Sequence, residues 1–146
     1  MGAFRMEKII IGCDHGGFEL KEAVKKFLKE GYEDITPELD KEDDYPDIAL
    51  EVANKVAGTN ALGIIICGTG IGVSITANKV KGIRAALCHN EFTAQMAREH
   101  NNANVLCMGG RVLEEAEALK IVKKFLETKF STEERHNRRV KKMDEL

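Results

Sequence analysis

The chain has 146 residues, of which 43% are hydrophobic and 32% are charged, and its formal net charge is −2 at pH 7. These values fit one folded domain of ordinary size and exclude a disordered chain. The small negative charge argues against a protein that binds nucleic acid or a membrane surface, and no apolar run approaches the ~18 residues of a membrane span.

The first residues and the cysteines indicate a cytoplasmic protein. The opening stretch, MGAFRMEKII, lacks the long apolar core of a signal peptide, and we expect residues 1–5 to be an extension, with Met6 as an alternative start. No two cysteines form a C-x-x-C pair, so neither a zinc site nor a thioredoxin-type site is expected. We expect the thiols to be reduced and to bind no metal; they are Cys13, Cys67, Cys88 and Cys107.

Strand and helix patterns alternate along the chain. In the first half they predict a strand over 8–13, a helix over 17–30, a short edge strand over 33–36, an acidic loop over 37–46 and a helix over 47–57. In the second half they predict strands over 62–67, 83–88 and 104–109, each followed by a helix, over 71–79, 91–100 and 113–130, and then a more polar helix over 132–146. Gly31 is expected to end the first helix, and Asp47 to cap the second.

This alternation predicts one α/β domain with a parallel sheet that is covered by helices on both faces. In such a sheet, ligands bind outside the carboxyl ends of the strands. We therefore expect the polar groups that follow the strands to share one rim of the sheet, with His89 only an exposed surface residue. These groups are Asp14 and His15, the loop after Cys67, His89 and Asn90, and the turn Gly109-Gly110-Arg111.

The loop ICGTGIGVS, residues 66–74, has three glycines in five residues after a buried strand. A dinucleotide site needs G-x-G-x-x-G after the first strand, but here the third glycine position holds Val73 and the loop follows the third strand. A P-loop needs Gly-Lys-Ser/Thr, which is absent. Two interpretations remain open: a tight turn that needs glycine, and a set of backbone N–H groups that binds an anion at a helix start.

Cys67 lies directly before these glycines. The positive end of the following helix would favour its thiolate, so Cys67 is a candidate base or nucleophile with an oxyanion-binding loop beside it. The other three cysteines lie in or at the end of apolar strands, where cysteine is a small buried hydrophobe. Asp14 either caps a helix or belongs to the site, and His100, at a predicted helix end, either satisfies the helix dipole or exchanges protons.

Arg135 and Arg139 are four residues apart near the end of the chain, on one face of the predicted helix. Two guanidinium groups at this spacing suit a phosphate, and Arg111 is a candidate third ligand. The alternative is a solvated charged helix face. The basic run is too short to indicate nucleic-acid binding in a chain that is otherwise acidic.

Five motifs occur in order over nearly the whole chain: GCDHGGFELK near the start, DYPDIA at 44–49, ICGTGIGVSITANKVKGIRAALC at 66–88, REHNNANVL at 98–106 and RHNRRV at 135–140. Together they resemble type B ribose-5-phosphate isomerase, in a family that includes galactose-6-phosphate and allose-6-phosphate isomerases. The resemblance implies a Rossmann-like three-layer α/β/α sandwich over 1–146, with a five-stranded, mainly parallel sheet and a C-terminal helix. It also implies an isomerase without cofactor or metal that interconverts ribose 5-phosphate and ribulose 5-phosphate through a cis-enediolate.

The resemblance implies a role for each matched residue. Cys67 would be the base that moves a proton between C2 and C1, Thr69 would lie near the reacting carbons, and His100 with Asp14 would open the sugar ring. Some members use an acidic base later in the loop, but Val73 holds that position here. The substrate would be bound by the loop residues Gly68, Gly70, Ile71, Gly72 and Val73, whose last four N–H groups hold the enediolate oxygen, by Tyr45 and Asn101 at the sugar, and by His15, Arg111, Arg135 and Arg139 at the phosphate.

The same resemblance implies a homodimer, since the C-terminal arginines would come from the neighbouring subunit; in some members dimers pair into tetramers. Two segments depart from the family pattern. The segment 33–43 is acidic and lacks the usual glycine-bearing turn, and Thr132, Glu133 and Glu134 stand where many relatives have Gly-Gly. A six-carbon sugar phosphate as substrate therefore remains an alternative, as does a sugar-phosphate binding domain without catalytic activity.

Overall fold

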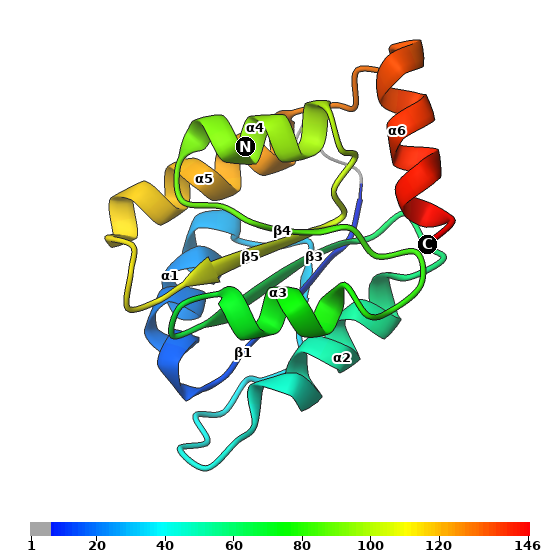
Figure 1. Ribbon diagram of the computed structural model, residues 1–146. Coiled ribbons are helices and arrows are strands. Elements are labelled where there is room, and N and C mark those ends of the chain that lie inside the picture. The colour runs from blue at the N-terminus through cyan, green and yellow to red at the C-terminus, as the bar shows by residue number, and fades with distance from the viewer. Residues whose placement is uncertain (1–6) are drawn as a thin grey trace.

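Five strands form one sheet in the computed structural model, which describes residues 7–146; the extension expected at residues 1–5 lies outside the described residues. The strands are β1 (Ile9–Cys13), β2 (Tyr32–Asp34), β3 (Leu62–Cys67), β4 (Ala85–Leu87) and β5 (Val105–Gly109). Their order is β2-β1-β3-β5-β4, and every neighbouring pair is parallel (Figure 1). β1, β3 and β5 are buried along their whole length, which explains their continuous apolar sequences.

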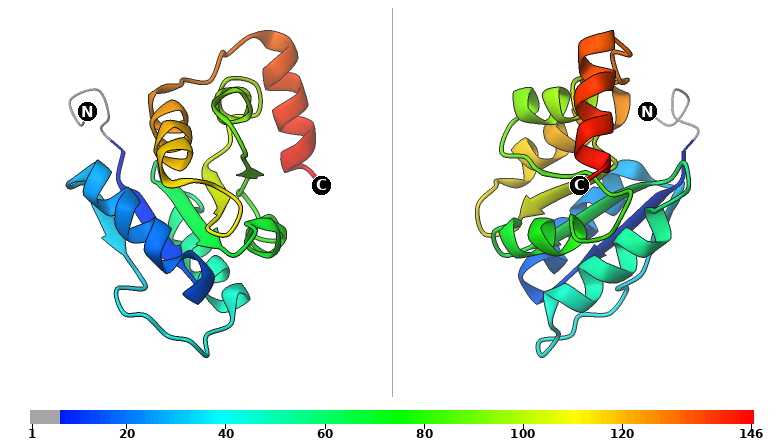
Figure 2. Two further views of the ribbon diagram at one scale, coloured as in Figure 1. Left: turned by 90° about the vertical axis from the view of Figure 1, so that its left-hand side faces the viewer. Right: turned by 45° about the vertical axis from the view of Figure 1, so that its right-hand side comes forward.

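Helices cover both faces of this sheet (Figure 2). They are the short 3-10 helix η2 (His15–Gly17) and the α-helices α1 (Phe18–Leu28), α2 (Tyr45–Val56), α3 (Ile71–Ala77), α4 (Glu91–Glu99), α5 (Glu115–Glu127) and α6 (Glu134–Asp144). One apolar cluster joins α1, α4 and α5 to one face, and a second cluster joins α2 and α3 to the other. The predicted α/β/α sandwich is confirmed, with a sheet that is wholly rather than mainly parallel.

Two predicted helix boundaries are wrong for local reasons. The first helix ends at Leu28 rather than near Gly31, because Lys29 already takes the positive φ of 69° that closes it. α2 begins at Tyr45 and includes Pro46, since a proline in the first turn removes an N–H that has no helical partner. Its N-cap residue is consequently Asp44 and not Asp47.

α6 lies beside the layers instead of on either face (Figures 1 and 2). Its last turn is tied to the residue before β4 by an ion pair between the Arg84 guanidinium and Asp144, with an N–O distance of 3.0 Å. The segment before α6 is tied to the end of α4, where the Ser131 N–H donates to the Glu99 carbonyl at 3.0 Å. α6 is therefore fixed near the amino ends of β4 and β5. Within residues 7–146, no helix combines the length and apolar character needed to cross a bilayer.

Candidate active site

Cys67 ends β3 and lies on the predicted rim of the sheet. The residue is 5% exposed, and its sulfur accepts a hydrogen bond from the Gly70 N–H at 3.1 Å. Its carbonyl oxygen accepts from the Gly110 N–H at 2.8 Å, which fixes the loop to the turn after β5. A sulfur that receives a backbone N–H at a helix start is well placed to carry negative charge.

Gly70 turns the chain from β3 into α3. Its φ is 80°, in the left-handed region that favours glycine, and a Cβ there would lie 2.6 Å from Leu87 Cδ1 and 2.8 Å from the Met108 carbonyl carbon. The same turn aims the Gly70 N–H at the Cys67 sulfur. The two interpretations of the loop are thus compatible, because the turn that needs glycine is also the one that directs a donor toward the thiol.

The first turn of α3 holds the other predicted oxyanion donors. The Ile71 N–H makes a long hydrogen bond of 3.3 Å to Thr69 Oγ1. Gly72 and Val73 follow in the first turn, where a helix has no acceptor of its own for the N–H groups. Tyr45, at the start of α2, covers this turn so closely that a Cβ on Gly72 would overlap its ring. Tyr45 therefore lies directly against the loop.

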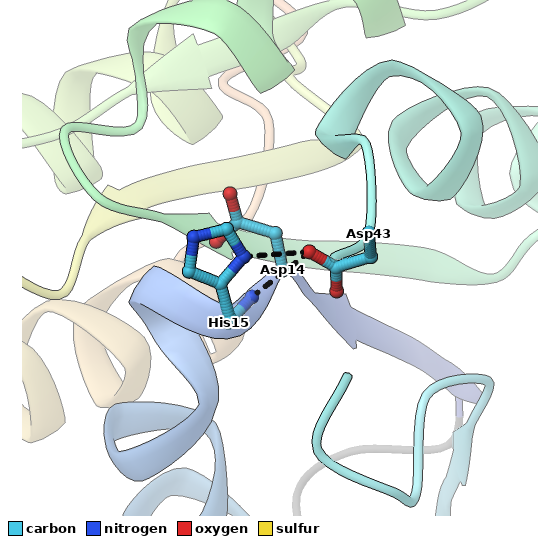
Figure 3. Close-up of side chains that lie close together, drawn as sticks. All are labelled: Asp14, His15 and Asp43. Atoms are coloured by element: carbon cyan, nitrogen blue, oxygen red, sulfur yellow. Dashed lines mark hydrogen bonds and ion pairs between the residues drawn. The ribbon is translucent and has the colours of Figure 1, made fainter. Parts of the chain in front are cut away.

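Asp14 and His15 follow β1 on the same rim (Figure 3). Asp14 is 8% exposed, and its Oδ1 accepts the Gly16 N–H at 2.9 Å, so it caps the short helix η2. The Nδ1 atom of His15 lies 2.8 Å from Asp43 Oδ1. Asp43 comes from the acidic loop, 28 residues further along the chain, and no motif or spacing in the sequence identified it as a partner of His15.

These three residues also form the only group of three candidate metal ligands within residues 7–146, with one ligand atom of each within 4.8 Å of the others. Hydrogen bonds already use the atoms concerned, since Asp43 faces Nδ1 of His15 and Asp14 accepts from the backbone of Gly16. Each of the three side chains therefore already takes part in a hydrogen bond within the described residues.

Arg111 brings positive charge to this rim. Its backbone N–H donates to the Gly68 carbonyl at 2.9 Å, and its guanidinium lies against the same glycine, where a Cβ would be 2.9 Å from Nη1. His89 is exposed at the end of β4, and Asn90 caps α4 by accepting the Thr93 N–H at 2.8 Å. We refer to Asp14, His15, Tyr45, Cys67 with its loop to Val73, and Arg111 as the rim half-site.

The remaining predicted residues lie at the opposite end of the sheet, near α6. α4 starts after the carboxyl end of β4 and runs back, so His100, its C-cap, lies near the amino end of β5 (Figure 1). β5 alone separates the two ends by ~13 Å at the usual rise of a strand. Within one chain, His100 therefore does not meet Asp14. We refer to His100, Asn101, Arg135 and Arg139 as the C-terminal half-site.

His100 is stacked on His136, a residue that sequence reasoning missed although it stands between the two arginines. The ring centroids are 4.2 Å apart, and the rings are inclined by 29°. Nδ1 of His136 lies 2.6 Å from Ser131 Oγ. Burial, with further contributions from His100 and Arg135, lowers the pKa of His136. Arg135 forms an ion pair with Glu133, whereas Arg139 is exposed one turn later.

The other cysteines lie in the core, as predicted. Burial raises the pKa of Cys13 to about 11, in spite of the opposing effect of Lys21. Burial likewise raises the pKa of Cys88 to about 11 and that of Cys107 further. Among the four cysteines, Cys67 is the one whose sulfur accepts a backbone N–H at a helix start within the described residues. This contrast favours Cys67 as the reactive cysteine.

Comparisons with known proteins find relatives over almost the whole chain. The model of the family described as Ribose/Galactose Isomerase matches residues 9–143. A probable ribose-5-phosphate isomerase B of Mycoplasma genitalium is 47% identical over 141 residues and covers 92% of both chains. Ribose-5-phosphate isomerase B of Mycobacterium tuberculosis is 44% identical and covers 91% of this chain and 85% of its own.

Solved structures give the same result. Ribose-5-phosphate isomerase B from Mycoplasma genitalium with bound ribulose-5-phosphate has a TM-score of 0.91 and 45% identity, over 97% of this chain and 96% of that chain. Type B ribose 5-phosphate isomerase from Trypanosoma brucei has a TM-score of 0.90 and 46% identity, over 96% and 98%. Since sequence and fold agree over almost the whole length, the chain belongs to the ribose/galactose isomerase family.

Proposed function

We propose that this chain interconverts ribose 5-phosphate and ribulose 5-phosphate, with Cys67 as the base. The observation that carries the proposal is the Cys67 sulfur, which accepts the Gly70 N–H at the rim of a fold that, in a relative, has been solved with bound ribulose-5-phosphate. The two sugars differ by the position of one carbon-bound proton and of the carbonyl group. A base beside an array of N–H donors is what this reaction needs.

The steps use groups of the chain alone. The Cys67 thiolate takes the proton from C2, and the electron pair moves through C1 to the oxygen on C1, which gives the cis-enediolate. The thiol then returns the proton to C1 while a proton passes from the oxygen on C2 to the oxygen on C1, so the carbonyl moves to C2. The N–H groups from Gly70 to Val73 stabilise the negative oxygen, as preorganised donors do in enzymes generally. A base that is partly ionised near neutral pH suffices.

The rest of the rim half-site holds the substrate. Tyr45 lines the sugar, Thr69 lies at the reacting carbons, and Asp14 takes part in ring opening. His15 and Arg111 bind the phosphate, which fixes the sugar relative to the base. Hydrogen bonds from charged groups make such phosphate contacts strong.

We further infer that the C-terminal half-site comes from a second copy of the chain. The two half-sites lie at opposite ends of one protomer, and exposed apolar side chains stand at the same end of the sheet as the Cys67 loop. Ile71, Phe92 and Val112 are 51%, 67% and 54% exposed, and all three stand at the carboxyl end of the sheet. Such an apolar surface favours association. In the resulting homodimer, the partner's His100 opens the ring with Asp14, and the partner's Arg139 binds the phosphate.

The first experiment removes the base. Cys67→Ala is expected to lower kcat by ~10³-fold or more while substrate still binds, since general-base catalysis commonly contributes ~10²–10⁴-fold. Cys88→Ala, which removes a buried thiol from the apolar cluster on the opposite face of the sheet, serves as the control and should retain most of the kcat. Near-wild-type turnover by Cys67→Ala would overturn the assignment. If no solvent deuterium enters ribose 5-phosphate, the chain is a sugar-phosphate binding domain without catalytic activity. An assay with allose and galactose phosphates tests whether the substrate is a six-carbon sugar phosphate.

The second experiment tests the shared site. Cys67→Ala and Arg139→Ala chains, each inactive or weak alone, are mixed after reversible dissociation. Random pairing makes about half of the dimers mixed, and each mixed dimer holds one site with both half-sites intact, so ~25% of wild-type activity should return. No recovery, in spite of exchange shown by mass spectrometry of tagged chains, would place the complete site within one chain.

A further inference from the structure

The acidic segment before α2 makes one inward contact with the rim half-site. Between residues 37 and 47, Asp43 is the least exposed residue, and its side chain is 15% exposed. Its Oδ1 lies 2.8 Å from Nδ1 of His15 and also accepts the His15 backbone N–H at 3.3 Å (Figure 3). The proposed isomerase mechanism gives this contact no role.

The segment is held on both sides of this contact. At its start, the Thr36 hydroxyl oxygen accepts the Cys13 N–H at 3.0 Å, and the Thr36 carbonyl accepts from Lys21 Nζ at 2.5 Å. At its end, the Asp44 carbonyl accepts the Asp47 N–H at 3.2 Å as α2 begins. Asp43 is therefore attached directly to a fixed helix start, which limits the positions that its carboxylate can take.

The contact determines which nitrogen of His15 carries hydrogen. A carboxylate can only accept, so Nδ1 must carry a hydrogen whether the imidazole is neutral or charged. The second ring nitrogen, Nε2, points away from Asp43 (Figure 3). Nε2 is left for a ligand: it donates to a phosphate oxygen when the ring is protonated, or accepts from the hydroxyl of a phosphate monoanion. The hydrogen bond of one ring nitrogen sets the chemistry of the other.

We propose that Asp43 is a positioning residue that fixes the tautomer and ring orientation of His15, so that Nε2 faces the substrate phosphate. The proposal rests on the proposed function, from which the phosphate role of His15 comes. Asp14, the other acidic group near this ring, accepts from the Gly16 backbone and is engaged elsewhere. Arg111 supplies the fixed positive charge of the rim, and the Asp43 carboxylate balances the charge of a protonated His15.

The test uses Asp43→Ala, Asp43→Asn and the control Glu42→Ala, which removes the neighbouring exposed carboxylate of the same loop. Nitrogen-15 NMR of the imidazoles reports the tautomer, with the His15 signals assigned from a His15→Gln variant. The wild type and Glu42→Ala are expected to show hydrogen on Nδ1 in the neutral ring. Asp43→Ala should show a mixture with hydrogen on Nε2, and Asp43→Asn, which keeps an acceptor oxygen, should restore the wild-type tautomer.

The functional readout is binding of inorganic phosphate, measured both as competitive inhibition and as a shift of the His15 signals. In Asp43→Ala, Ki for phosphate and KM for ribose 5-phosphate should rise by ~10-fold with little change in kcat, in line with the loss of one hydrogen bond to a charged group. An unchanged tautomer in Asp43→Ala, or an altered tautomer with unchanged phosphate binding, would overturn the proposal. A wild-type chain that shifts His15 signals with phosphate but isomerises no sugar would overturn the proposed function and leave this proposal supported.

Discussion

Lys21→Met is expected to destabilise the fold strongly, because it removes the only fully buried charged side chain among residues 7–146. Lys21 Nζ lies 2.7 Å from Asp34 Oδ2 and 2.5 Å from the Thr36 carbonyl oxygen. The Lys21 side chain is 0% exposed and that of Asp34 is 8% exposed, so water does not replace the lost donor. The substitution removes one hydrogen-bond donor from each of these two part-buried oxygens.

The two oxygens differ in what remains to them. The Thr36 carbonyl loses its described donor, at a cost of ~1–3 kcal/mol. Asp34 keeps Lys25 Nζ at 2.9 Å and the Thr36 N–H at 3.0 Å, so it loses part of its stabilisation only. Breaking a buried ion pair costs ~3–5 kcal/mol, and the retained partners place this case near ~3 kcal/mol. For a chain of this length, that corresponds to a fall in Tm of about 10 °C.

Thermal unfolding followed by circular dichroism checks this value, with Lys26→Met on the exposed side of α1 as the matched control. The control should change Tm by less than about 2 °C, as exposed substitutions usually do. In a chain that already carries Asp34→Asn, Lys21→Met should lower the free energy of unfolding by ~1–2 kcal/mol less than it does in the wild type, because the two residues are in direct contact. A Lys21→Met variant as stable as Lys26→Met would refute the argument.

The same pair predicts a pH dependence. Burial raises the pKa of Asp34, but hydrogen bonds from Lys21 and Lys25 outweigh it, so the net pKa lies below the usual range. A depressed carboxyl pKa gives stability that is complete above the pKa of the unfolded chain, near ~3.9, and is lost as pH falls through the folded value. The Tm difference between wild type and Lys21→Met should therefore be constant near neutral pH and shrink below about pH 4. A difference that persists there would contradict the assignment of the charge.

Two further predictions concern the loop and its thiol. Gly70→Ala should lower the free energy of unfolding by ~1–2 kcal/mol for its positive φ and by ~1–3 kcal/mol more for the overlap with its neighbours. Gly82→Ala, with a φ of 88° and nothing within 4 Å of a Cβ, should show the first cost alone, so equal losses would contradict the packing argument. At pH 8, iodoacetamide should label Cys67 first and abolish activity, since burial raises the pKa of Cys13 and Cys88 to about 11. Peptide mapping by mass spectrometry that finds Cys88 labelled at the same rate would contradict this order.

The sequence was informative wherever local pattern decided the structure. The continuous apolar run before Cys67 identified β3, and the glycines after it identified the turn, because backbone geometry admits few residues there. The same local rules failed at Pro46, which can end one segment or begin another, and only the neighbouring packing decides between them. The prediction succeeds where residues close in sequence determine the structure, as at β3 and its turn. It fails where packing against distant residues determines it, as at Pro46.

The site was less predictable, because two of its features depend on long-range placement. Asp43 contacts His15 because of the course of the loop that carries it, and the sequence of that loop has no periodic pattern from which its course could be predicted. His100 lies at the end of a returning helix, so its position depends on the direction of α4 and not on the identity of its neighbours. A residue at the end of such a helix belongs at the amino edge of a parallel sheet, and this rule would have separated His100 from Asp14.

The separation of His100 from Asp14 within one chain affects how activity depends on the concentration of the protein. If each complete site is assembled from the opposite ends of two protomers, an isolated chain has no working site, and the number of sites follows the number of pairs. At concentrations well below the dissociation constant of the dimer, turnover should rise with the square of the protein concentration, and activity per chain should fall on dilution. A cell that makes little of this chain would then gain more than twofold in flux from each doubling of its synthesis.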